Sequence, residues 1–238
     1  MTDFYVAAPG ESSPPVPDGP RLCRGDDMRV VHNAFLWGYE RAPGLVRGVA
    51  AGDTVRSGLV GRWLGDLDAT LHVHHESEDT LLWDRLEGRA PACALHVGQM
   101  RAHHAQVQAL LHEAEPLLTS WRDSADPATG ERLADAYERM LAVLRVHLRR
   151  EVVEMIPVVE KVLTEAEWQE LGEHSMQAIP RSRLLPQIGF MITASPDAGP
   201  AMLDDAPTPV RWMYRLFGRR QFERTFRDLF PGEPIPRT

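Results

Sequence analysis

Two stretches of the chain carry apolar residues at steps of three and four, the pattern of a helix with one buried face. The first pattern follows Val60, Leu64, Leu67, Leu71, His74, Glu78 and Leu81. The second follows Leu133, Tyr137, Met140, Leu144, His147 and Glu151. In each, a histidine and a glutamate four residues later stand where leucine is expected. Four residues are about one helical turn, so each pair faces the buried side.

The two HxxxE pairs belong to a longer repeat. MRVVH ends at His32, upstream of His74, and MRAHH ends at His104, upstream of His147, at nearly the same separation. The chain therefore contains two copies of one plan, a helix with a single histidine followed by a helix with HxxxE. On the third helix, either His104 or His103 occupies the buried position.

Capping and helix-breaking residues predict where the elements begin and end. Four long helices are expected at residues 26–39, 54–87, 91–120 and 130–155. Pro43 and Gly44 should break the first helix, and the fourth should kink near Pro157 and end before Thr164. Thr164 and Glu167 form a capping box that opens a short helix to about residue 176. With short links and no useful β alternation, the fold class is all-α, an up-down-up-down four-helix bundle.

The segments on either side of the predicted bundle differ from it in amino-acid composition and pattern. Residues 1–22 are rich in proline and are expected to be a disordered leader, whereas residues 23–178 form the bundle. Residues 179–238 are expected to be a C-terminal extension of three or four short helices. Within it, residues 210–226 are amphipathic, aromatic and basic. We expect a helix pair that packs its aromatic residues on the bundle, and the alternative is a surface for a protein or a membrane. The aromatic residues concerned are Trp212, Tyr214, Phe217, Phe222 and Phe226.

Composition narrows the class of protein. Hydrophobic residues make up 43% of the 238 residues, enough for a core, and the net charge of −8 argues against nucleic acid as a partner. No apolar run is long enough for a transmembrane segment, and the N-terminus does not resemble a signal peptide. Cys23 and Cys93 form no CxxC pair. We therefore expect a cytoplasmic protein.

The buried histidines and glutamates predict a metal site, because an unpaired buried carboxylate costs several kcal/mol or more. The candidate ligands are His32, His74, Glu78, His104, His147 and Glu151. Imidazole with carboxylate suits iron or manganese, and zinc less well, and two carboxylates can bridge two ions. Glu-x-x-His pairs, HExxH, GxSxG and the P-loop are all absent from the sequence.

The order His, HxxxE, His, HxxxE resembles the hemerythrin-like family, also called HHE cation-binding domains, over residues 26–163. HHESEDTLLW and HLRREVVEMIP are similar to its two signature stretches, and the C-terminal tail resembles extensions on some bacterial members. The resemblance implies a non-haem centre of two Fe ions (Fe²⁺/Fe³⁺) with a bridging oxo or hydroxo group. By position, His32 and His74 would bind one iron, His104 and His147 the other, and Glu78 and Glu151 would bridge them.

The sequence departs from the oxygen-carrying members at two positions. Gln108 stands where their third helix has the second histidine of HxxxH, and Asp84 replaces a usual proline, whereas Pro157 is retained. His75, His103 or Tyr39 are reserve ligands for the vacated position, and His75 is the best placed of them. Glu76, Asp79 and Glu154 are expected to be solvated or to orient imidazole N–H groups. The expected non-ligands are His72, His96, His112 and His174.

The resemblance to this family implies that a small oxidant, O₂, NO or H₂O₂, is bound or consumed. Because one imidazole is missing, both irons should keep open positions, which favours chemistry over simple oxygen carriage. Catalase-like decomposition of peroxide and NO-related oxidoreductase activity are the expected enzymatic forms. The alternative is an iron-dependent sensor or interaction module that acts through the C-terminal helices.

Overall fold

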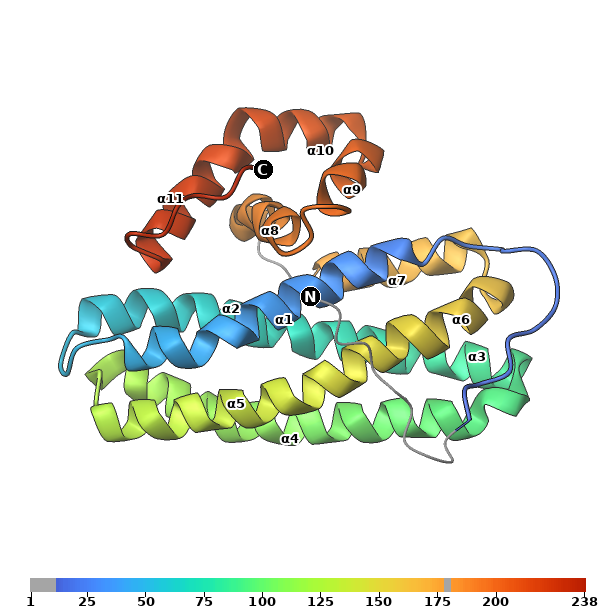
Figure 1. Ribbon diagram of the computed structural model, residues 1–238, viewed down its shortest axis with the longest axis horizontal. Coiled ribbons are helices and arrows are strands. Elements are labelled where there is room, and N and C mark those ends of the chain that lie inside the picture. Colours follow the sequence, from blue (N-terminus) through green and yellow to red (C-terminus); the bar gives the residue numbers. More distant parts are fainter. Residues whose placement is uncertain (1–11, 178–180) are drawn as a thin grey trace.

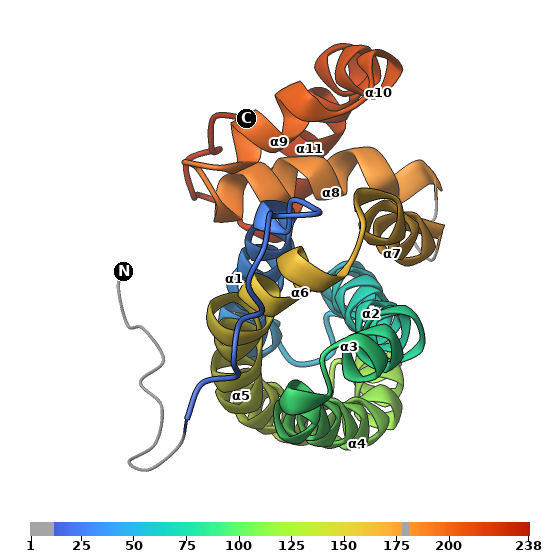
Figure 2. The same cartoon turned by 90° about the vertical axis from the view of Figure 1, so that its right-hand side faces the viewer.

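Four long helices run along the greatest dimension of the molecule and pack around one core (Figure 1). The computed structural model describes residues 12–177 and 181–238, and within these ranges all regular structure is helical. The four helices are α1 (Asp26–Arg47), α2 (Thr54–Ser77), α4 (Ala94–Ser124) and α5 (Pro127–Arg150). Seen end-on in Figure 2, they surround a common centre. The all-α class is confirmed for the described residues, whereas the up-down order of the helices stays a prediction.

Shorter elements extend two of the long helices and join them. The turn Glu78–Leu82 and α3 (Trp83–Arg89) continue α2, and a short 3₁₀ turn at Pro91–Cys93 leads into α4. The turn Glu151–Met155 and α6 (Ile156–Val162) continue α5. Pro157 lies in the first turn of α6, where a missing backbone N–H costs little, so the helical path continues to Val162.

The first helix is longer than its sequence predicts. Instead of ending before Pro43 and Gly44, α1 passes through both and ends at Arg47. Ala42 and Val46 on either side of the proline are buried in the core. Their packing offsets the hydrogen bond that a proline removes from a helix, so the predicted break does not occur.

Residues 12–25 lie against the bundle without forming a helix before Asp26. His96 Nε2 lies 2.7 Å from the carbonyl oxygen of Ser12, and Lys161 donates to the carbonyl of Gly19 at 2.6 Å. The backbone N–H of Leu22 donates to the Glu160 carbonyl. These contacts join residues 12–22 to the bundle, and the disordered leader at residues 1–22 stays a prediction. Residues 1–11 lie outside the described residues.

The C-terminal helices form a layer on one side of the bundle. The capping box at Thr164 and Glu167 is confirmed by reciprocal hydrogen bonds of 3.0 and 3.3 Å, and α7 (Glu165–Gln177) follows. The remaining helices are α8 (Arg181–Ala194), α9 (Gly199–Asp205), α10 (Thr208–Met213) and α11 (Arg219–Leu229), with a π-helical turn at Tyr214–Gly218. Figure 2 shows α8 between α1 and the outer helices. Within the described residues, no helix is both long and apolar enough to cross a bilayer.

The aromatic residues of this layer divide into two sets. Tyr214, Phe222 and Phe226 are buried, and Phe226 packs with Trp37 of α1. Trp212 and Phe217 point to solvent instead, with 61% and 59% of their surface exposed. The expectation that all five pack on the bundle is therefore wrong for these two. They leave the buried stripe because Tyr214, Gly218 and Phe222 fill it at intervals of four residues.

The buried histidines and glutamates divide the hydrophobic core of the bundle into two clusters along the helix axes. One hydrophobic cluster contains Phe35, Leu71, Val107 and Leu144, and a second cluster lies further along the same helices. The second cluster includes Met28, Leu82, Met100 and Met155, one from each of the four long helices and their continuations. Each run therefore has apolar residues on both sides of its buried histidine. The buried histidines and glutamates lie between the two hydrophobic clusters.

Candidate metal centre

The backbone changes its helical pitch at both glutamates of the HxxxE pairs. Glu78 and Glu151 are each the first residue of a five-residue π-helical turn. The N–H groups of Trp83 and Ile156 donate to their carbonyls, five residues apart instead of four. π-turns of this kind often occur at functional sites. The sequence repeat is thus also a repeat of backbone geometry, which presents both carboxylates to the same interior.

The first group of potential ligands joins α1 to α2. His32 Nε2 lies 3.0 Å from His74 Nε2, and His74 Nε2 lies 3.1 Å from Glu78 Oε1. His32 Nδ1 lies 3.0 Å from the carbonyl of Leu148 and donates its hydrogen to it. This bond leaves the lone pair of Nε2 directed at the group, the form in which an imidazole binds a metal ion.

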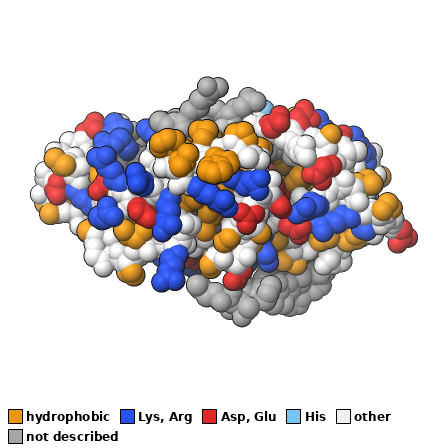
Figure 3. Space-filling model, turned by 90° about the horizontal axis from the view of Figure 1, so that it is seen from above, with side chains coloured by type: hydrophobic (Ala, Val, Ile, Leu, Met, Phe, Trp, Pro, Cys, Tyr) orange, Lys and Arg blue, Asp and Glu red, His pale blue; other side chains and the backbone are white. Residues whose placement is uncertain are grey.

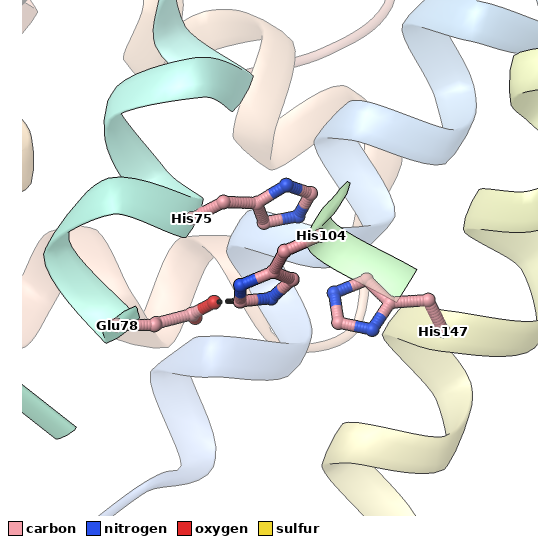
Figure 4. Close-up of side chains that lie close together, drawn as sticks. All are labelled: His75, Glu78, His104 and His147. Atoms are coloured by element: carbon pink, nitrogen blue, oxygen red, sulfur yellow. Dashed lines mark ion pairs between the residues drawn. The ribbon is translucent and has the colours of Figure 1, made fainter. Parts of the chain in front are cut away.

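The second group joins α2, α4 and α5, and Figure 4 shows its four side chains converging: His75, Glu78, His104 and His147. His104 Nε2 lies 3.4 Å from Glu78 Oε2, and the ring of His75 stacks on that of His104 with centroids 4.2 Å apart. His104 Nδ1 lies 2.9 Å from Asp79 Oδ1. Asp79 therefore orients the imidazole, as the sequence suggested, and directs the Nε2 lone pair inward.

Glu78 belongs to both groups. Its Oε1 faces His74 and its Oε2 faces His104, so one carboxylate spans the two sets of imidazoles. Glu151 approaches both sets as well, since its Oε2 lies 3.6 Å from His32 Nε2 and 3.8 Å from His147 Nε2. Within each group of ligands, the candidate atoms lie within 4.8 Å of one another.

Burial sets the charge of these side chains in the metal-free chain. It lowers the pKa of His32 to about 4 and the pKa values of His74, His75 and His147 well below the usual value. These four imidazoles are therefore neutral at pH 7. Burial raises the pKa values of Glu78 and Glu151, and the mutual repulsion of the two carboxylates raises that of Glu78 further.

The donor set fits bound cations. Glu78 and Glu151 are fully buried, and among the described residues no hydrogen-bond donor satisfies any of their four oxygens. The Nε2 atoms of His75, His104 and His147 also have no hydrogen-bond partner there. Buried acceptors without donors are rare in folded proteins. Cations placed between neutral imidazoles and acidic oxygens would satisfy them all, which makes this a metal-binding site in its chemistry.

Among the reserve ligands, only His75 joins a group. Tyr39 donates its hydroxyl to Asp68 at 2.8 Å, and His103 lies beside His147 with ring centroids 5.6 Å apart, outside both groups. The sequence treated His74 and His75 as alternatives. Consecutive helical residues point about 100° apart, however, and α2 packs between α1 and α4, so each histidine faces a different neighbour. The consecutive histidines His74 and His75 were the feature of the sequence that could have indicated two ligands on α2.

The expected non-ligands lie outside both groups. His72 and His112 are exposed, His96 contacts the Ser12 carbonyl, and His174 Nδ1 lies 2.8 Å from Ser77 Oγ. Glu154 forms a buried ion pair with Arg150 at 2.9 Å. Glu76 is exposed.

A cavity of about 170 Å³ borders the second group. It reaches His75 and His104 and passes the side chain of Gln108 on the exposed face of α4. The other lining residues are His72, Glu76, Asp79, Thr80 and Leu111. The volume has room for water or a ligand of a few atoms beside the imidazoles.

Comparison with known proteins agrees with this geometry. A family model described as the hemerythrin HHE cation binding domain matches residues 26–170, more than half of the chain. The match includes every residue of the two groups. No match was found among curated proteins or among solved structures.

Proposed function

The chain belongs to the hemerythrin HHE cation-binding domain family, and on that premise we propose that it holds two iron ions and binds or consumes a small oxidant. The observation that carries the proposal is the position of Glu78. A carboxylate with one oxygen toward each group of imidazoles is the arrangement that a bridging ligand needs. Iron is preferred to manganese or zinc because the donors combine several imidazoles with two carboxylates.

The two groups supply unequal ligand sets. His32 and His74 would bind the first ion, and His75, His104 and His147 the second. Glu78 would bridge the two ions, and Glu151 would be the second bridge. His75 fills the place that Gln108 leaves in the sequence pattern. With His75 in the second group, we propose that the first ion has fewer imidazoles than the second, whereas Gln108 in the sequence pattern suggests the reverse.

The protein would orient the imidazole ligands and limit the access of solvent to the bound ions. Asp79 and the Leu148 carbonyl hold His104 and His32 in the tautomers that direct Nε2 into the site. The two hydrophobic clusters keep bulk water from the site on both sides along the helices, and the cavity beside Gln108 has room for a small ligand. Bound iron would supply one-electron redox chemistry and open coordination positions. Because two imidazoles leave positions free at the first ion, peroxide turnover or NO binding is favoured over reversible oxygen carriage.

Metal analysis with an optical spectrum tests the proposal. Purified chain should carry about two irons and absorb in the near ultraviolet, and peroxide should be consumed with a change in that absorption. Glu151→Ala should lower the iron content, whereas Glu87→Ala, an exposed carboxylate on α3, should not. A colourless chain that fills with zinc and takes up no iron would contradict the proposal. Repeating the experiment with NO distinguishes the two favoured oxidants.

A second candidate function is a sensor or interaction module. It is favoured by the exposed side chains of Trp212 and Phe217 on the layer of C-terminal helices. In this role the metal centre would influence the layer through α1, which contacts both α2 and α8. Removing the metal should then change binding at the C-terminal helices, and unchanged binding would argue against coupling.

A further inference from the structure

An apolar ridge crosses the outer surface of the C-terminal layer. We define it as Trp212, Met213, Leu216 and Phe217, from α10 and the π-helical turn that follows. Between 51% and 61% of each side chain is exposed. In Figure 2, α10 lies at the edge of the molecule far from the bundle. Four large apolar side chains gathered on one helical turn are unusual on the surface of a soluble domain and mark a binding surface.

The helical run that carries the ridge is amphipathic over its whole length. Its inner stripe, Tyr214, Gly218, Phe222, Phe226 and Leu229, is buried. The outer stripe begins with the apolar ridge and continues at steps of three and four to Arg220, Arg224 and Arg227, which are exposed. The inner face therefore packs against the rest of the protein. The outer face is apolar at its N-terminal end and carries arginines at its C-terminal end.

The charge of this run is opposite to that of the whole chain. Residues 208–229 contain six arginines and two acidic residues, whereas the net charge of the chain is −8. Arg215 pairs with Asp204, and Arg219 pairs with Glu223. Among the described residues, no carboxylate partner is found for Arg220, Arg224 or Arg227. In Figure 3, hydrophobic side chains gather in the middle of this face, with Lys and Arg side chains along their border.

We propose that the apolar ridge and the arginines of α11 dock the protein on the surface of an anionic lipid bilayer. A helix with aromatic and aliphatic residues beside arginines lies in the interface between headgroups and acyl chains. Tryptophan is favoured at that depth, and long arginine side chains reach the phosphate groups. Lipids can rearrange around the exposed side chains of the ridge. Charge complementarity selects anionic over neutral lipids.

Vesicle flotation with the full-length, metal-loaded protein tests this assignment. Vesicles of phosphatidylcholine with phosphatidylglycerol should bind the protein about tenfold or more tightly than phosphatidylcholine alone. Salt should weaken the binding. Replacing the ridge with Trp212→Ser and Phe217→Ser should lower the affinity about tenfold or more, as should Arg220→Gln with Arg224→Gln and Arg227→Gln. Brominated lipid should quench fluorescence less in the Trp212→Ser variant.

Matched variants elsewhere show that the effect belongs to this surface. Leu95→Ser removes an apolar side chain with 71% exposure on α4, and Arg132→Gln removes an exposed arginine on α5. Both should bind vesicles as the wild type does, and all variants should keep its helix content and metal content. Equal binding to neutral vesicles, or no binding to anionic ones, would overturn the proposal. So would self-association that the ridge variants abolish while vesicle binding is absent, because the ridge would then be a protein interface.

Discussion

His74 and His75 are consecutive on α2, yet they belong to different groups of imidazoles. His74 approaches His32 of α1, whereas His75 stacks on His104 of α4. Glu78 is the residue that both groups share. Removing one histidine or the other should therefore affect different ions, which makes the two roles separable by experiment.

His75→Ala should weaken binding of one metal ion and leave the other in place. The variant removes one of three imidazoles from the second group, and loss of a ligand or of its support commonly costs about 10- to 100-fold in metal affinity. We expect metal titration to show one tight and one weak site per chain. His72→Ala is the control, because His72 lies three residues earlier on the same helix but is exposed. Two unaffected sites in the His75 variant would refute its assignment.

Asp79→Asn should reduce metal affinity without removing a ligand. Asp79 accepts the Nδ1 hydrogen of His104, so its loss frees the imidazole to rotate and lowers its basicity. The expected loss is about tenfold, measured by competition with a chelator. Asp84→Asn provides the comparison, since that carboxylate pairs with Arg101 on the surface. If both variants bound metal equally well, Asp79 would have no orienting role.

Metal affinity should rise with pH between about 6 and 8. Burial raises the pKa values of Glu78 and Glu151, so the metal-free chain retains protons there that bound cations must displace. Each proton released makes the affinity about tenfold greater per pH unit. Four of the histidines, His32, His74, His75 and His147, add little to this slope because their lowered pKa values leave them neutral across the window.

Anaerobic titration with Fe²⁺ at several pH values, together with the proton release on binding, measures this dependence. Glu151→Gln should flatten the slope because the amide has no proton to lose. An affinity that does not change between about pH 6 and 8 would contradict protonated glutamates in the metal-free chain.

Asp68→Ala should destabilise the bundle. The hydroxyls of Tyr39 and Tyr137 each donate to one oxygen of Asp68 at 2.8 Å, and both tyrosines are fully buried. Removing this carboxylate leaves both buried hydroxyls without an acceptor, which lowers the free energy of unfolding by about 1–3 kcal/mol for each. Denaturant unfolding measures the loss, and Asp84→Ala on the surface should change stability by less than about 0.5 kcal/mol.

Asp68 also predicts a pH dependence of folding. Burial raises its pKa to about 7 from the usual 3.8, whereas the tyrosine hydrogen bonds act in the opposite direction. Between these values the folded chain holds a proton that the unfolded chain has released, so this contribution to stability falls as the pH rises. Asp68→Asn should remove that part of the decline, and an unchanged pH profile would exclude the raised pKa.

The amino-acid sequence by itself determined which side chains face the interior of each helix. The three- and four-residue spacing placed His74 and His147 on buried faces, and the repeat added His32 together with His104 or His103. Thr164 with Glu167 marked the start of α7. These are local relationships, set by helix geometry and by the hydrogen-bonding groups at helix ends. The order His, HxxxE, His, HxxxE and the two signature stretches likewise indicated the family, which the family model confirms.

Only the tertiary structure decided which buried faces meet. It brought His75 into the second group, gave Glu78 a histidine on each side, and left Trp212 and Phe217 exposed. It also carried α1 through Pro43. The reason is that helical spacing defines a direction around one axis, whereas neighbours depend on how several axes pack and where π-turns shift the pitch. The candidate site is a property of four packed helices, because no single helix supplies all the residues of either group.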